Sequence, residues 1–172
     1  MPFLYKLGVG DSPIHGKGLF ALEDIPKGVV YWVYESSCDS VPVLGFDARP
    51  NQINRKEDLD AIKDAEKLHS IMRRSFYYAD ADVLIEGNDG SEFMNHWEDP
   101  NSQIVYNEEK DYRKLISVTL RDIKAGEEVV EDYANYVFGH TPWANHYMST
   151  YYPERKALEN TYIHRAPAKK ST

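Results

Sequence analysis

The apolar residues of this chain occur in short runs separated by glycine, proline, asparagine and aspartate, and this spacing limits the fold more than any other feature. The longest apolar run covers residues 29–34, whereas a membrane-spanning helix needs roughly 20 apolar residues. The N-terminus also lacks the basic and apolar leader of a secreted protein. With 172 residues, of which 42% are apolar or aromatic, the chain is predicted to form one soluble, non-secreted domain.

Short strands are predicted in both halves of the chain. β-branched and aromatic residues mark them at 18–21, 29–34, 83–85, 103–106, 115–120 and 128–130. The first two are expected to form a hairpin-like pair. Between about 55 and 75, apolar residues recur at helical spacing, and Asn54 with Glu57 resembles a capping box, which predicts one amphipathic helix. The expected fold class is therefore mostly β with short helices, an α+β arrangement.

Acidic residues predominate in the centre of the chain. The net charge is -8, and residues 80–132 hold fifteen acids against five bases, whereas residues 153–172 hold five bases against two acids. Because phosphate binding needs a basic face, this charge disfavours nucleic acid as the main partner. The acidic excess favours a Lys/Arg-rich peptide as the ligand, and an acidic solvated surface with no specific role is the alternative.

The usual catalytic and metal-binding patterns are missing from the sequence. It lacks a GxSxG elbow, a GxxxxGK[ST] phosphate loop and an HExxH zinc motif. The single cysteine, Cys38, excludes an internal disulfide and a thiolate cluster within the chain, and the six histidines show no paired ligand spacing. We therefore expect no metal.

Three ordered segments carry the strongest functional signal. They are IHGKGLFA at 14–21, FMNHWEDPN at 93–101 and RDIKAGEEVVEDY at 121–133. A D-I-x-x-G turn occurs at 24–28 and again at 122–126. In this order and at these separations, the segments resemble the motifs of the SET-domain protein lysine methyltransferases, and the likeness covers most of the chain.

The resemblance implies a SET fold of small curved sheets, in which the segment ending at Tyr133 passes through the second motif in a knot-like arrangement. It implies a SET domain over residues 1–152, with the helix at about 55–75 inserted beside the peptide groove. An aromatic flank at about 134–152 is part of this domain. A basic tail at 153–172 is expected to follow it.

The same resemblance implies a binding site for S-adenosylmethionine. Two glycines in the first motif let the backbone approach a ligand closely, and in the family this loop holds the cofactor, which places Gly16, Lys17 and Gly18 in its pocket. A plain turn before a strand is the alternative interpretation. Asn95 and His96 are expected to contact the adenine edge and the amino-acid head of the cofactor, or else to be structural turn residues.

Tyr133 is the predicted catalytic residue. Methyl transfer to an amine needs a neutral nucleophile aligned with the methyl carbon in a dry site, so we expect the hydroxyl to orient the lysine and contact the sulfonium region. A phenol with a pKa of about 10 is a poor general base at neutral pH, and the departing proton is expected to leave through water. The alternative is that Tyr133 is a tyrosine packed in the core or at its edge, with no catalytic role.

The chain departs from the family at three places. Trp97 stands where the family usually has serine, and Glu131 stands where many members carry a phenylalanine or tyrosine that limits how many methyl groups fit. No cysteine-rich flanking module is present to close the lysine channel. Aromatic residues of the C-terminal flank are expected to close it instead, with Trp143 stacking on adenine, although core packing explains them equally well. They are Tyr136, Phe138, Pro142 and Trp143.

The sequence therefore predicts a protein-lysine N-methyltransferase that acts on a basic protein segment such as a histone tail. One alternative is a non-catalytic SET-like module that binds a basic peptide, which Trp97 and Glu131 motivate. Another is methylation of a small molecule or free amine. The aromatic C-terminal segment is consistent with a homodimer and equally with intramolecular packing. Cysteine usage fits the cytoplasm or the nucleus.

Overall fold

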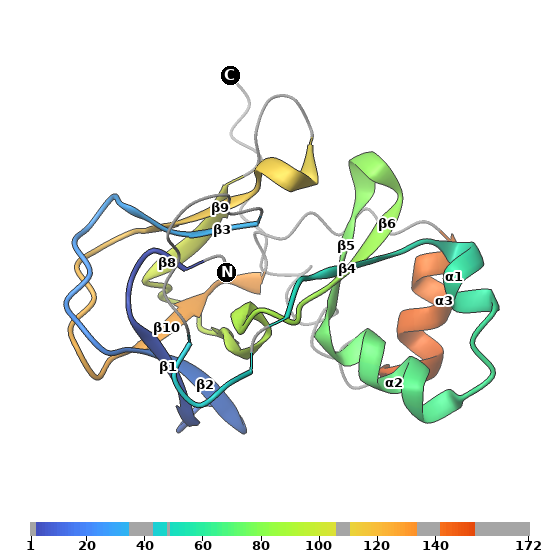
Figure 1. Cartoon of the computed structure of the whole chain (residues 1–172), viewed down its shortest axis with the longest axis horizontal. Coiled ribbons are helices and arrows are strands. Elements are labelled where there is room, and N and C mark those ends of the chain that lie inside the picture. Colours follow the sequence, from blue (N-terminus) through green and yellow to red (C-terminus); the bar gives the residue numbers. More distant parts are fainter. Residues whose placement is uncertain (1–2, 35–42, 48, 106–110, 134–141, 154–172) are drawn as a thin grey trace.

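The structure is a computed structural model that describes residues 3–34, 43–47, 49–105, 111–133 and 142–153. Its strands are β1 (Leu7–Asp11), β2 (Lys17–Ala21), β3 (Val30–Val33), β4 (Gln52–Asn54), β5 (Ser75–Tyr78), β6 (Val83–Glu86), β7 (Asn95–His96), β8 (Ser102–Val105), β9 (Ile116–Thr119) and β10 (Glu128–Glu131). Its α-helices are α1 (Lys56–Asp60), α2 (Ala65–Arg74) and α3 (Pro142–Tyr151), and its 3-10 turns are η1 (Ala79–Ala81), η2 (Ser91–Phe93) and η3 (Tyr112–Lys114). The predicted fold class, mostly β with short helices, is confirmed (Figure 1). None of the helices in these ranges has the length and apolar composition that crossing a bilayer requires.

Strand β10 lies in the middle of the larger sheet although it is the last strand of the described chain. Among the described residues, this sheet has seven strands in the order β1-β2-β10-β8-β9-β3, with β7 also paired to β10. β10 runs antiparallel to β2 and parallel to β7 and β8. The third motif is therefore held between the first motif, in β2, and the second, in β7.

The expected hairpin between residues 18–21 and 29–34 is wrong, because its two strands pair with other partners. β2 pairs with β1 and β10, and β3 pairs with β9. The two D-I-x-x-G turns explain the exchange. Ile25 bridges Ile123, and each turn's aspartate accepts a backbone hydrogen bond from the other turn, at 3.0 Å for Asp24 and 2.8 Å for Asp122. The unit of β2, its turn and β3 thus pairs with the unit of β9, its turn and β10, and neither unit forms a hairpin of its own.

The inserted segment holds two helices, α1 and α2, where the sequence predicts one over about 55–75. Asp64 interrupts the helix because its carboxylate accepts hydrogen bonds from two backbone N–H groups of the next turn, at 2.9 and 3.2 Å, and so starts α2 as an N-cap. The predicted capping box is displaced by one residue, since Asp58 accepts the Arg55 N–H at 2.8 Å.

The inserted unit consists of α1, α2 and a small antiparallel sheet in the order β4-β6-β5, and α3 packs against it. Figure 1 shows these elements together at one end of the molecule, away from β1 and β2. The described part of the predicted aromatic flank is thus a helix on the insert. Tyr136 and Phe138 lie outside the described residues.

Two apolar cores hold the described residues together. The core of the larger sheet contains Phe3, Leu7, Leu19, Ala21, Ile25, Tyr31, Trp32, Val43, Tyr78, Val83, Ile85, Met94, Leu115, Ile123 and Val129. The core of the inserted unit contains Leu59, Leu68, Ile71, Met72, Tyr77, Leu84, Ala144, Tyr147 and Met148. Strands β5 and β6 contribute to both cores because their side chains alternate between the two faces of the small sheet.

Candidate active site

The side-chain amide of Asn95 joins all three sequence motifs. Its Nδ2 donates to the main-chain oxygens of His15 and Lys17 at 3.2 and 3.0 Å, and to Oε1 of Glu128 at 2.7 Å. The first motif supplies the two carbonyls, the second supplies the amide and the third supplies the carboxylate. Residues that are far apart in the sequence therefore meet at one strand, β7.

The two glycines of the first motif have different roles. A Cβ at Gly18 would collide with the carboxylate of Glu128, so a larger residue there would displace that carboxylate from its present position. Gly16 has a φ of +52°, in the left-handed region, and no atom lies within 4 Å of where its Cβ would be. The outer side of this loop is therefore open, which is what close approach of a ligand to the backbone requires.

Glu128 is a site residue that sequence reasoning did not single out. Besides accepting from Asn95, its carboxylate accepts a hydrogen bond from the Ser12 hydroxyl at 2.9 Å. It thereby ties the loop that precedes β2 to the central strand β10. The signal was present in the third motif, as an acid directly before the apolar pair 129–130, but a single sequence does not show which of the adjacent acids, Glu127 or Glu128, faces the glycine loop.

The contacts of Asn95 with His15, Lys17 and Glu128 form a junction of the three motifs. Lys17 takes part in this junction through its main chain. Its ammonium group pairs with Oδ1 of Asp11 at 2.6 Å on the exposed surface, and that contact lowers the pKa of the Asp11 carboxyl. The Lys17 carbonyl, in contrast, accepts the bond from Asn95. Lys17 therefore contacts Asn95 through its main chain, whereas its side chain pairs with Asp11 on the surface.

Tyr133 and His96 lie against each other at the end of β10. The Tyr133 N–H donates to Nδ1 of His96 at 3.1 Å, and the two ring centroids are 5.4 Å apart. Because Nδ1 accepts this bond, a neutral His96 carries its proton on Nε2. The Tyr133 hydroxyl donates to the main-chain oxygen of Met94 at 2.5 Å. The predicted catalytic hydroxyl is therefore fixed to the backbone one residue before Asn95.

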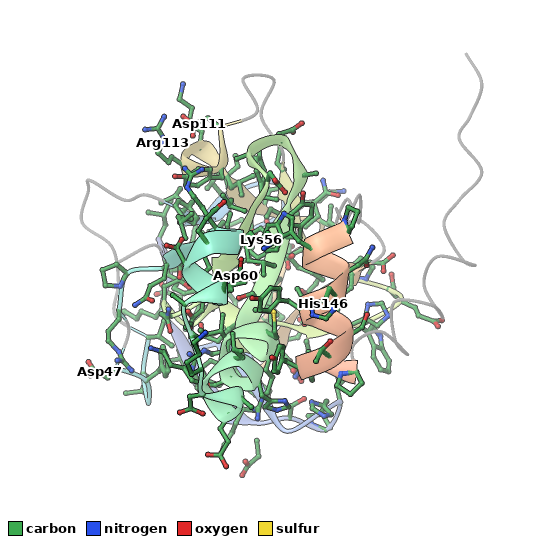
Figure 2. The ribbon with its side chains drawn as sticks, turned by 90° about the vertical axis from the view of Figure 1, so that its right-hand side faces the viewer. Asp47, Lys56, Asp60, Asp111, Arg113 and His146 are labelled. Carbon is green, nitrogen blue, oxygen red and sulfur yellow. The ribbon has the colours of Figure 1, made fainter. Side chains whose placement is uncertain are left out.

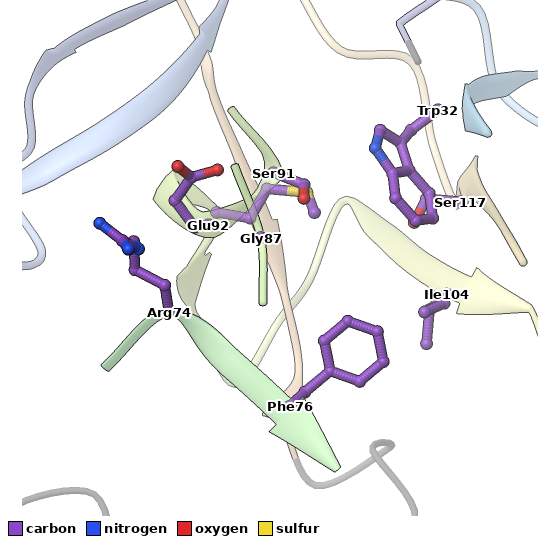
Figure 3. A pocket seen from close by; sticks show the side chains of 9 residues that line it. Trp32, Arg74, Phe76, Gly87, Ser91, Glu92, Ile104 and Ser117 are labelled. Carbon is purple, nitrogen blue, oxygen red and sulfur yellow. The ribbon is translucent and has the colours of Figure 1, made fainter. Parts of the chain in front are cut away.

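A cavity of about 60 Å³ adjoins Met94 (Figure 3). Its lining comes from β3, the β8–β9 pair, the inserted unit and the segment between β6 and β7: Trp32, Arg74, Phe76, Gly87, Ser91, Glu92, Met94, Ile104 and Ser117. Successive side chains in extended backbone point to opposite sides, so Met94 faces the cavity whereas Asn95 faces the glycine loop. The segment of Met94 and Asn95, whose Met94 carbonyl accepts the Tyr133 hydrogen bond, therefore separates the open glycine loop from a largely apolar cavity.

Glu131 lies behind the cavity wall in a buried polar cluster. Its Oε1 accepts hydrogen bonds from the Ser117 hydroxyl at 3.0 Å and from the Tyr31 hydroxyl at 3.3 Å. Tyr31 is also 3.1 Å from the hydroxyl of Ser102. Burial, together with the charge of Glu131, raises the pKa of Tyr31 well above its ordinary value, so Tyr31 is a neutral donor. The unusual acid at this position is thus hydrogen-bonded within the fold.

Trp143 lies apart from the other predicted site residues. Its Nε1 donates to Oδ1 of Asp82 at 2.9 Å, and its ring makes an edge contact with Tyr77 at 6.0 Å. Both contacts belong to the inserted unit, whereas the glycine loop belongs to the larger sheet. Stacking of Trp143 on a cofactor stays a prediction from the sequence. Within the described part of the chain, no three His, Cys, Asp or Glu side chains gather as a metal site would need.

Comparisons with known proteins identify a family and a shared fold. The sequence matches the family described as SET domain over residues 16–134, and no curated protein matches it. A putative histone methyltransferase of Plasmodium falciparum is 18% identical over 81% of this chain and 97% of its own, with a TM-score of 0.47. A Chaetomium thermophilum Polycomb Repressive Complex 2 structure with mutations in Ezh2 is 19% identical over 83% of this chain and 16% of its own, with a TM-score of 0.52. This second likeness shows a shared fold, and the present chain spans only a small part of that protein.

Proposed function

Because this chain belongs to the SET domain family, whose members are generally S-adenosylmethionine-dependent lysine methyltransferases, we propose that it methylates a lysine side chain in a basic protein segment. One observation carries the proposal. The backbone around Met94 and Asn95 has the open glycine loop on one side, the apolar cavity on the other and the Tyr133 hydroxyl bound to it. A methyl donor on the loop side and a lysine acceptor on the cavity side would meet at this hydroxyl.

We assign the cofactor to the side that carries the glycine loop. The left-handed, uncovered backbone at Gly16 fits a ligand that lies directly on the main chain. Residues 16–18 would hold it through main-chain groups, with Asn95 fixing the loop and His96 next to it. When bound, S-adenosylmethionine supplies an activated methyl group on a sulfonium.

We assign the acceptor lysine to the cavity. Its apolar walls, which include Trp32, Phe76 and Ile104, exclude water around an aliphatic side chain. Such surroundings disfavour the charged ammonium and so promote the neutral amine that methyl transfer requires. Arg74 and Glu92 both line the cavity. The Arg74 charge is balanced by its ion pair with Glu86 of β6, so the Glu92 carboxylate can attract a basic segment.

Tyr133 acts as the orienting group at the junction. Its O–H bond to the Met94 carbonyl fixes the phenol, and the hydroxyl oxygen then accepts an N–H of the amine and directs the nitrogen lone pair at the methyl carbon. The chemistry needs no strong base at this position, because the lysine ammonium loses its proton to water before the neutral amine attacks.

The test is transfer of a radiolabelled methyl group from S-adenosylmethionine to a panel of basic proteins that includes histones. We expect Tyr133→Phe to lower the transfer rate roughly 100-fold, which is the scale of losing one positioned hydrogen-bonding group, while calorimetry shows little change in cofactor affinity. Tyr5→Phe is the matched control, since Tyr5 is another partly buried tyrosine, packed against the core of the larger sheet.

The outcomes separate the candidate functions. Wild-type turnover by Tyr133→Phe would remove Tyr133 from the mechanism. Label on free amines but on no protein would favour a small-molecule substrate. The buried cluster around Glu131 makes a non-catalytic module the second candidate, and that candidate predicts retained affinity for basic peptides without cofactor binding or transfer.

A further inference from the structure

Trp97 is exposed next to the candidate cofactor site. Its side chain is 51% exposed, whereas Trp32 is 3% exposed and belongs to the core of the larger sheet. An indole is the largest apolar side chain, and a folded protein gains by covering it. An exposed tryptophan beside a binding loop therefore suggests a surface that a ligand covers.

The position of Trp97 is fixed by the sheet. Its backbone N–H donates to the main-chain oxygen of Glu131 at 3.1 Å, which extends the parallel ladder between β7 and β10 by one residue. Side chains two residues apart in such a ladder share a face, so Trp97 lies on the same face as Asn95. That is the face on which Asn95 contacts the carbonyls of His15 and Lys17, on either side of Gly16.

From this juxtaposition we propose that the Trp97 indole forms one wall of the cofactor site and stacks on the flat heteroaromatic base of the ligand. The inference rests on the proposed function, and it adds a residue that serine at the same position would not supply. Gly16 leaves the loop backbone uncovered, and the exposed indole offers a rigid apolar surface on the face of β7 from which Asn95 reaches that loop. Stacking on such a face is favourable for any purine.

The experiment measures binding and needs no turnover. S-adenosylhomocysteine and adenosine are titrated by calorimetry into the wild type, Trp97→Ala and Trp97→Phe. We expect Trp97→Ala to weaken both ligands roughly tenfold, as loss of one base–aromatic stack does, and Trp97→Phe to weaken them less. Leu44→Ala is the matched control, because Leu44 is 67% exposed and lies beside Gly8 on β1. Urea unfolding of each variant verifies that it is folded.

Tryptophan fluorescence identifies which ring the ligand covers. The chain has three tryptophans, so ligand-induced changes are compared in Trp97→Phe and Trp143→Phe. Loss of the change only in Trp97→Phe supports the inference. Equal affinities of wild type and Trp97→Ala would overturn it, as would a signal that follows Trp143. Absence of binding to the wild type would instead overturn the proposed cofactor.

Discussion

The larger sheet and the inserted unit are stabilised by different kinds of contact. In the larger sheet, polar side chains join strands that are distant in the sequence. Asn101, fully buried, donates to the Glu128 carbonyl at 2.7 Å and accepts the Val130 N–H at 2.9 Å. In the inserted unit, Tyr147 and Met148 of α3 pack into the apolar core around α2, whereas the hydrogen bonds of α3 from Trp143 to Asp82 and from Tyr147 to Asp60 are exposed or half-buried.

This difference matches what each region contributes to the site. Hydrogen-bonded side chains fix backbone positions closely, and the larger sheet fixes the glycine loop and the Tyr133 hydroxyl in this way. Packing in an apolar core fixes the volume that the side chains fill more closely than it fixes the orientation of any one group. The inserted unit accordingly supplies walls of the cavity, Arg74 and Phe76, where shape is the main requirement. The cofactor side and the acceptor side should therefore respond separately to mutation.

The largest expected effect on stability is in the inserted unit. Met148→Ala removes a side chain that is 2% exposed, and we expect the free energy of unfolding to fall by about 2–5 kcal/mol because the core is left with a cavity. Urea denaturation measures this fall, and calorimetry should show nearly unchanged affinity for S-adenosylhomocysteine. Thr150→Ala, on an exposed position of the same helix, is the control. A parallel loss of cofactor affinity would mean that the stability of the inserted unit is coupled to the binding site in the larger sheet.

An intermediate effect is expected at the junction of the motifs. Asn95→Ala leaves two carbonyls and the Glu128 carboxylate without their shared donor. Because water can reach these acceptors, the free energy of unfolding should fall by about 0.5–1.5 kcal/mol, and cofactor binding should also weaken. Asn101→Ala is the matched comparison, because it removes hydrogen bonds to the same strand away from the glycine loop. If both variants bind the cofactor equally well, Asn95 has no special role at the site.

The smallest effect is expected at Tyr147, and it depends on pH. Burial, with the hydrogen bond from its hydroxyl to Asp60 at 2.7 Å, raises the pKa of Tyr147 to about 12, above an ordinary value of about 10 (Figure 2 shows Asp60 of α1 near α3). The folded state thus favours the neutral phenol. Its contribution is present below about pH 10 and lost as the pH rises toward 12.

Tyr147→Phe should therefore flatten the decline of the unfolding free energy between about pH 10 and 12. Urea titrations at several alkaline pH values measure the slope, and the change at neutral pH should be smaller than that of Asn95→Ala. Tyr152→Phe, in the same segment, controls for general tyrosine ionisation. Identical slopes for wild type and Tyr147→Phe would exclude Tyr147 as the titrating group.

The sequence by itself determined the local features of this protein. β-branched runs placed strands at 29–34 and 115–120, and the order of the three motifs indicated both the family and Tyr133. These features follow from residue types at short spacing, which act within a few residues. Even there, the single helix predicted at about 55–75 is two helices, because one side chain, Asp64, prefers to cap a new helix.

Only the tertiary structure decided which segments meet. The pairing of β2 with β10 and of β3 with β9 depends on contacts between turns about a hundred residues apart. Local sequence patterns do not show which strands pair over such distances. The same holds for Glu128 under the glycine loop and for α3 on the inserted unit. Residue type thus specified what each segment can form, whereas long-range packing specified the site.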